Sequence, residues 1–204
     1  MEKDGSVFLS EIGMVAQLAA CDCVAMQLPA SSDKKLILAA HAVGALGKSQ
    51  IASVFFTEMT RSQASQVAQA GGFREDFSVV AAPRSAEEWK NLPEVPLSPT
   101  APPLIVCDLP VAGAAEAVRQ LKAAGHLILY AGADAQEVDA IRAASIPCAF
   151  ALSSCEEAQT TADVVLLSDF TGCLGNVKQH CSLAASSPAM YVAKSIAPQI
   201  CGGI

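Results

Sequence analysis

The chain has 204 residues, of which 52% are hydrophobic and 16% charged, so it can form one large domain or two small ones. Its formal net charge is −7, and no stretch gathers lysine and arginine on one face. Because nucleic acids and anionic membranes are bound through basic patches, both classes of partner are disfavoured.

The beginning of the chain and its apolar runs predict a soluble protein without a membrane span. The first residues, MEKDGS, do not start a basic and then apolar leader. No run reaches the roughly 18 uninterrupted apolar residues of a membrane helix. The eight cysteines are scattered and are expected to be reduced thiols. We expect a location in the cytoplasm or inside an organelle, with any membrane contact made through a partner.

The first half of the chain mixes predicted helices with two short predicted strands. Helical spacing and capping residues predict helices over residues 8–20, 34–59, 60–70 and 85–92. Short apolar runs predict strands over residues 23–26 and 77–82. Five prolines then follow within residues 93–103, and this stiff stretch predicts a linker.

The second half alternates apolar strands with helices. The predicted strands are residues 104–107, 127–130, 148–152 and 164–167. The predicted helices are residues 113–124, 135–144, 155–161 and most of 170–195. Continuously apolar strands that alternate with helices are typical of a parallel sheet covered on both faces. The sequence therefore predicts a Rossmann-like α/β fold.

Four stretches resemble, in the same order, the cytoplasmic region of P-type ATPases, with the heavy-metal and potassium transporters as the most similar branches. They are residues 5–32, 36–55, 104–146 and 162–181, the last of which contains ADVVLL. The resemblance implies a haloacid-dehalogenase-like parallel sheet with a small inserted α/β lobe. It implies that residues 1–32 and 104–204 form the phosphorylation-domain-like core. Residues 33–95 would be a reduced nucleotide-binding-like lobe, and residues 93–103 the linker.

Under this resemblance the catalytic positions are degenerate. Gln27 stands where the family has its nucleophilic aspartate, Ala131-Gly132-Ala133 stand for T-G-D, and Ser49-Gln50 for a His-Pro pair. The family's lysine and its GDGxND segment would be deleted after Ile146. Phosphoryl transfer depends on positioning and charge stabilisation, so the resemblance implies a protein that is not an enzyme and holds no cofactor.

Two further features of the sequence could support phosphorylation of an aspartate or binding of a nucleotide. Asp108 follows the run LIVCD and could be phosphorylated, as could Asp163, but Pro110 occupies the place of a second aspartate. A polar residue that ends a strand and caps the next turn is the favoured interpretation of Asp108. The loop at Gly132 could bind a nucleotide phosphate, although Asp134 and Glu137 would repel it.

Cysteines suggest two incomplete metal sites. Cys21 and Cys23 form a C-x-C pair without further ligands nearby in the sequence. Cys173 and Cys181, eight residues apart, could share one face of a helix, with His180 next to Cys181 as a further candidate. Since free cysteine usually behaves as a small buried hydrophobe, packing is the favoured interpretation of both sets.

Three functions are consistent with these patterns. The first is a non-catalytic structural or interaction subunit, with a protein partner or a second copy of the chain. The second is a regulatory module that senses a nucleotide or a metal ion. The third is a haloacid-dehalogenase-like phosphotransferase with an unusual site.

Overall fold

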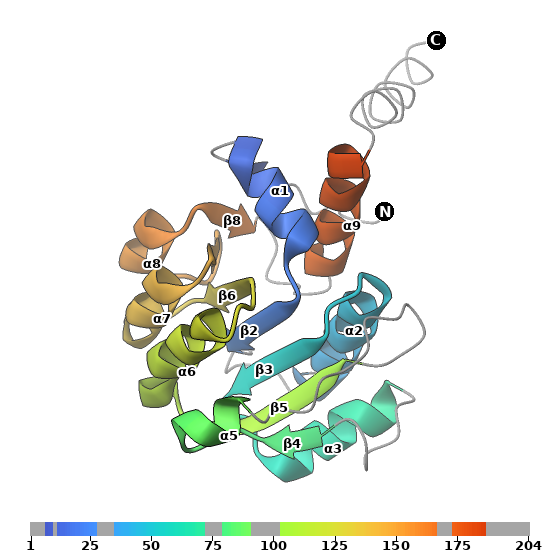
Figure 1. Ribbon diagram of the computed structural model, residues 1–204, viewed down its shortest axis with the longest axis vertical. Coiled ribbons are helices and arrows are strands. Elements are labelled where there is room, and N and C mark those ends of the chain that lie inside the picture. The colour runs from blue at the N-terminus through green and yellow to red at the C-terminus, as the bar shows by residue number, and fades with distance from the viewer. Residues whose placement is uncertain are drawn as a thin grey trace.

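The computed structural model of the chain contains one open sheet with helices on both of its faces (Figure 1). It describes residues 7–9, 12–27, 35–71, 79–90, 103–166 and 173–186. In these residues the sheet has eight strands in the order β1-β8-β7-β6-β2-β3-β5-β4. β1 runs antiparallel to β8, and the other neighbouring strands pair in parallel.

The strands and helices alternate along almost the whole described chain. The strands are β1 (Val7–Leu9), β2 (Cys23–Gln27), β3 (Ser53–Thr57), β4 (Val79–Ala81), β5 (Leu104–Leu109), β6 (Ile128–Gly132), β7 (Ile146–Phe150) and β8 (Val164–Leu166). The helices are α1 (Ile12–Ala20), α2 (Lys35–Lys48), α3 (Arg61–Ala70), α5 (Ala86–Lys90), α6 (Val111–Ala123), η1 (Ala135–Glu137), α7 (Val138–Ala143), α8 (Glu156–Thr161) and α9 (Cys173–Ser186).

Two apolar cores lie on opposite faces of the sheet. Val24 and Met26 of β2 point into the core that also holds buried side chains of α1, α2, α3 and α9. Cys23 and Ala25, the alternate residues, point into the core shared with α5, α6, α7 and α8. Because successive side chains of a strand point to opposite faces, a fully buried central strand is apolar on both.

The predicted α/β Rossmann-like fold is confirmed, but residues 33–95 do not stand apart from the sheet. They supply β3, which lies between β2 and β5, and β4, which pairs with β5. The reason is the run Ser53–Thr57, which was expected to continue a helix and instead forms a strand with every residue buried. Gln50, whose φ is 61°, ends the preceding segment in a left-handed conformation.

Most other predicted elements of the described chain are present with small shifts at their ends. The exception near the N-terminus is β1, since residues 8–20 were expected to be helical throughout. The predicted linker lies mostly outside the described residues, as does the end of the last predicted helix. None of the helices in the described ranges combines the length and hydropathy that crossing a bilayer requires.

Helix α9 packs against α1 and α2 and joins three segments that are distant in sequence. The Lys178 ammonium is buried and donates to the carbonyl oxygens of Ala19, at 3.0 Å, and of Cys21. The Ser49 hydroxyl at the end of α2 lies 2.8 Å from the carbonyl oxygen of Gly175. A Cβ atom on Gly175 would lie 2.8 Å from the carbonyl oxygen of Ala45, so the helices touch backbone to backbone.

Candidate functional site

The carboxyl ends of β2 and β6 form the candidate site. β2 and β6 are parallel neighbours at the centre of the sheet. The chain leaves β2 for α2 on one face, and leaves β6 for η1 and α7 on the other. In open α/β sheets, ligands bind at the carboxyl ends of two neighbouring strands whose connections leave toward opposite faces of the sheet. The two connections leave a crevice between them at that point.

Gln27, the last residue of β2, faces two carboxylates at this place. With its amide oriented so that the nitrogen faces acceptors, that nitrogen donates to Glu137 Oε2 at 2.8 Å and to Asp134 Oδ2 at 3.1 Å. An uncharged amide group thus lies between two acidic side chains.

Glu137 is fully buried, and nearby donors saturate its carboxyl group. Its Oε2 accepts the backbone N–H groups of Ala133 at 2.9 Å and Asp134 at 3.2 Å, in addition to the Gln27 amide. Its Oε1 accepts the Tyr130 hydroxyl at 2.8 Å. Burial raises the pKa of Glu137 above its ordinary value and outweighs the lowering by these donors. Burial therefore disfavours the charged form of Glu137 relative to a carboxyl group in water.

Thr57, at the end of β3 and paired with Gln27, adds a buried hydroxyl beside the same group. It lowers the pKa of the Tyr130 phenol, which burial and Glu137 raise more strongly. No atom of the described residues completes a hydrogen bond to the Thr57 hydroxyl at normal geometry. Thr57 and Tyr130 were missed in the sequence, because both lie in apolar runs that predict only core strands and helices.

The donor set does not fit a resident Mg²⁺ ion. Magnesium takes octahedral oxygen ligands and usually keeps several waters. Here Glu137 has no exposed surface, and its Oε2 already accepts three N–H groups. The Gln27 amide donates toward the ion's place instead of offering a carboxylate. The Glu137 carboxyl oxygens already accept hydrogen bonds from the loop after β6 and from Gln27.

No family model matches the sequence, and no curated protein is similar to it in sequence. Solved structures do match the fold. The 3-deoxy-D-manno-octulosonate 8-phosphate phosphatase of Moraxella catarrhalis superposes with a TM-score of 0.54 at 12% identity over 90% of this chain and 99% of that one. The corresponding phosphatase of Haemophilus influenzae gives 0.50 at 14% identity, over 88% and 97%. The catalytic domain of the CPx-ATPase CopB gives 0.51 at 9% identity, over 84% and 94%.

The chain has a haloacid-dehalogenase-like fold. Within this fold the structure brings together some of the predicted site residues. Ala131 and Gly132 end β6, and Ala133 follows them in the loop that reaches Gln27 through Asp134 and Glu137. A Cβ atom on Gly132 would lie 3.0 Å from the Ile141 side chain, so glycine lets α7 pack closely on the haloacid-dehalogenase-like sheet.

Other predicted residues lie elsewhere in the haloacid-dehalogenase-like fold. Ser49 and Gln50 precede β3, and Asp163 precedes β8, so these residues lie at the opposite, amino edge of the sheet from Gln27. His180 is exposed and Cys181 is buried on α9, and burial raises the pKa of the Cys181 thiol. The structure describes the backbone of Cys173 and leaves its side chain outside the described part.

Asp108 lies at the carboxyl edge but does not cap the next helix. It is exposed, and its backbone has a φ of 57°. The carboxylate that accepts the N–H of Val111, the first residue of α6, belongs to Glu58, at 3.2 Å. Glu58 also has a positive φ of 59° and follows β3. The capping role expected of Asp108 therefore falls to Glu58, whose strand was not predicted.

Replacing Glu137 with glutamine should flatten part of the protein's pH dependence. A carboxyl group with a raised folded pKa stabilises the fold below its unfolded value near 4.5, and this contribution is lost as the pH rises through the folded value. A glutamine side chain keeps an oxygen that can accept the backbone N–H groups of Ala133 and Asp134, and it carries no proton that is lost in this pH range. Urea unfolding of both proteins from acid to neutral pH measures the difference. If the free energy of unfolding changed with pH in the same way in both proteins, this prediction would be contradicted.

Proposed function

We propose that this chain is a non-catalytic haloacid-dehalogenase-like domain that acts as a structural or interaction subunit of a larger assembly. The observation that carries the proposal is the Gln27 amide, which donates to Asp134 and Glu137 where a catalytic site needs a nucleophile and a cation. An amide oxygen is too weak a nucleophile to attack a phosphoryl group. The Glu137 carboxyl and the Gln27 amide nitrogen satisfy each other and the neighbouring loop, and the Thr57 hydroxyl is left without a completed hydrogen bond among the described residues.

The acidic loop supports a revised alignment with the resembled family. Gly132 to Glu137 reads GADAQE, which can be aligned with G-D-G-x-N-D without a gap. Gly132 is identical to the first residue of the motif and Glu137 is acidic like its last, whereas Ala133, Asp134 and Gln136 differ from the motif. Under this alignment the metal-binding segment was altered by substitution and was not deleted after Ile146. The position of β6 beside β2 supports this alignment, because the loop then lies next to the nucleophile position.

Catalytic activity is the direct test of the non-catalytic part. The chain is incubated with acetyl phosphate, and separately with ATP, in the presence of Mg²⁺, and its intact mass and phosphate release are measured. We expect no phosphoprotein and no release above that of the Gln27→Met variant, in which both amide hydrogen bonds are removed. Phosphorylation of the wild-type chain, absent from Gln27→Met, would contradict the proposal.

Association is the test of the subunit part. We expect the native chain in gentle extracts to migrate with a partner protein, or as more than one copy, in size-exclusion chromatography with light scattering. A lone monomer under those conditions would contradict the subunit role and leave the non-catalytic part standing. The two experiments therefore fail separately.

A haloacid-dehalogenase-like phosphotransferase with an unusual site is the second candidate. The buried Thr57 hydroxyl, without a completed hydrogen bond at the carboxyl edge, favours a site that receives a polar ligand. The Moraxella phosphatase of the same fold is described in complex with magnesium and phosphate ions. The intact-mass experiment separates the two candidates, because only the second gives a phosphoprotein or released phosphate.

A further inference from the structure

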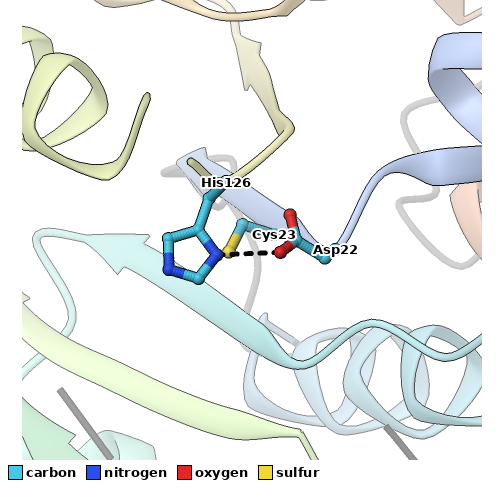
Figure 2. Close-up of side chains that lie close together, drawn as sticks. All are labelled: Asp22, Cys23 and His126. Atoms are coloured by element: carbon cyan, nitrogen blue, oxygen red, sulfur yellow. Dashed lines mark hydrogen bonds and ion pairs between the residues drawn. The ribbon is translucent and has the colours of Figure 1, made fainter. Parts of the chain in front are cut away.

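Three potential metal ligands converge at the amino edge of the sheet, far from Gln27. Asp22 precedes β2, Cys23 begins it, and His126 precedes β6 (Figure 2). One ligand atom from each residue lies within 4.8 Å of the other two. The sequence suggested Cys21 and Cys23 as half of a metal site, but the structure groups only Cys23 with Asp22 and His126. The Cys21 side chain belongs to the apolar core on the opposite face of the sheet.

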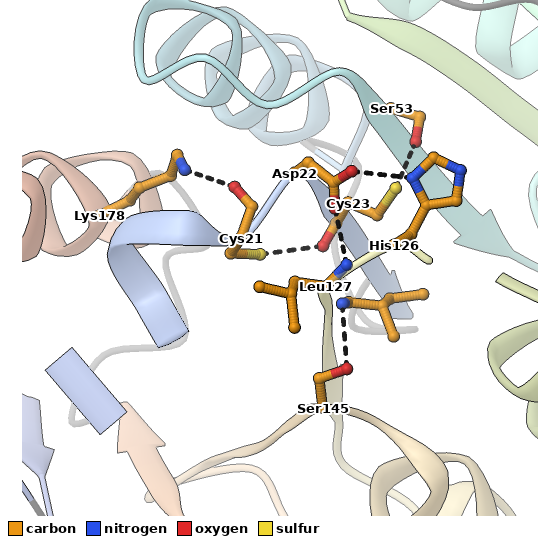
Figure 3. A network of polar contacts seen from close by, with 9 residues as sticks. Cys21, Asp22, Cys23, Ser53, His126, Leu127, Ser145 and Lys178 are labelled. Carbon is orange, nitrogen blue, oxygen red and sulfur yellow. Dashed lines mark hydrogen bonds and ion pairs between the residues drawn. The ribbon is translucent and has the colours of Figure 1, made fainter. Parts of the chain in front are cut away.

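Backbone and side-chain contacts hold the three residues in place. Asp22 Oδ1 accepts the N–H of Leu127 at 2.9 Å, and Asp22 Oδ2 lies 2.8 Å from His126 Nδ1 (Figure 3). The carbonyl oxygen of Asp22 accepts the N–H of Ala52 at 2.8 Å, next to β3. The cluster thus bridges three neighbouring strands, so its geometry is set by the sheet.

The donor set suits one class of cation. A thiolate, an imidazole nitrogen and a carboxylate oxygen together select borderline cations such as Zn²⁺ over the hard cations Mg²⁺ and Ca²⁺. Zn²⁺ binds these atoms at about 2.0–2.3 Å, so ligands already within 4.8 Å of one another need only a small contraction.

Solvent can complete the coordination. The side chains of His126 and Asp22 are 40% and 27% exposed, so water can reach the fourth position from their side. Cys23 is buried, and its sulfur lies 3.0 Å from the Ser53 hydroxyl. That hydroxyl can donate to a thiolate once the thiol proton has left, which satisfies the buried sulfur.

We propose that Asp22, Cys23 and His126 form a three-ligand site for Zn²⁺, with water as the fourth ligand. On binding, the Cys23 thiol proton passes to water, and the imidazole keeps its proton on Nε2 while Nδ1 binds the ion. The ion ties the start of β2 to the junction of α6 and β6. The site makes the subunit responsive to a metal ion, and it does not depend on the absence of catalysis at Gln27.

Cobalt titration of the full chain tests the site, because Co²⁺ replaces Zn²⁺ and absorbs light. We expect one equivalent of Co²⁺ to give tetrahedral visible bands and a thiolate-to-cobalt charge-transfer band, both removed by Zn²⁺. His126→Gln keeps a donor for Asp22 and removes the ring nitrogen, and should weaken Co²⁺ binding at least tenfold. His41→Gln, at an exposed histidine on α2, is the matched control and should bind as the wild type does.

Cys23→Ala removes the proposed sulfur ligand and separates this site from the other thiols of the chain. It should abolish the charge-transfer band while far-ultraviolet circular dichroism stays unchanged. A band that persists in Cys23→Ala would overturn the proposal, as would equal losses in His126→Gln and His41→Gln. Absence of the band in the wild-type chain would overturn it whether or not the variants fold.

Discussion

Gln27→Glu should destabilise the protein by about 2–3 kcal/mol at neutral pH. Glutamate has the shape of glutamine, so it places a third carboxylate 2.8 Å from Glu137 Oε2 and 3.1 Å from Asp134 Oδ2, where the amide now donates. Like charges at such distances in a half-buried site repel strongly, and two hydrogen bonds are lost with the amide. The partial exposure of Gln27 keeps the loss below that of a fully buried charge.

Urea unfolding of Gln27→Glu, with Gln27→Met as the neutral control, measures this loss. The methionine variant loses the same hydrogen bonds without adding charge, and should cost about 1–2 kcal/mol. The deficit of Gln27→Glu should shrink on acidification, since protonation removes the repulsion. It should also shrink when millimolar Mg²⁺ is added, because three carboxylates can then share a cation.

Equal stabilities of Gln27→Glu and Gln27→Met at neutral pH would mean that the Gln27 amide does not hold the two carboxylates together. The observation behind the proposed function would then fail. Insensitivity of the glutamate variant to acid would lead to the same conclusion. Mg²⁺ rescue alone bears only on whether three carboxylates make a competent cation site.

Gly175→Ala should destabilise the protein by about 1–3 kcal/mol through the contact of α9 with α2. The added Cβ would lie 2.8 Å from the carbonyl oxygen of Ala45 and 2.9 Å from its carbonyl carbon, which are backbone atoms that cannot rotate away. The helices must move apart, and the Ser49 hydroxyl then loses its contact with the carbonyl oxygen of Gly175.

Gly44→Ala is the matched control, because it makes the same change on α2 where nothing lies within 4 Å of the added atom. It should stabilise the chain by about 0.5–1 kcal/mol, since alanine has the higher helix propensity. Thermal and urea unfolding of both variants measure the difference. If Gly175→Ala were as stable as Gly44→Ala, α9 would not pack on α2 at this distance.

The second half of the fold could be predicted because local pattern and tertiary structure agree there. The apolar runs there are short and mostly buried: all five residues of β6 are buried, as are four of the five residues of β7. In the first half, the alanine-rich α2 runs almost directly into Ser53–Thr57, and periodicity does not separate a buried strand from a buried helix. The missed β3 made residues 33–95 look like a separate lobe.

The candidate site was only partly predictable for a related reason. Gln27 and the loop from Ala131 were found through a family resemblance, which supplies positions along the chain. The contact of Gln27 with Glu137 depends on β2 and β6 being neighbours, and strand order is not written in local pattern. The pairing of Asp22 with His126 depends on the same strand order, so both clusters became visible only in three dimensions.

Strand β2 has five residues and carries Cys23 at one end and Gln27 at the other. At about 3.3 Å per residue, the two ends lie on the order of 13 Å apart. Energetic effects at such separations are usually additive. The amino edge and the carboxyl edge of the sheet can therefore be changed independently. A metal site could be added or removed at one edge without altering the stability of the site at the other, although both edges share strand β2.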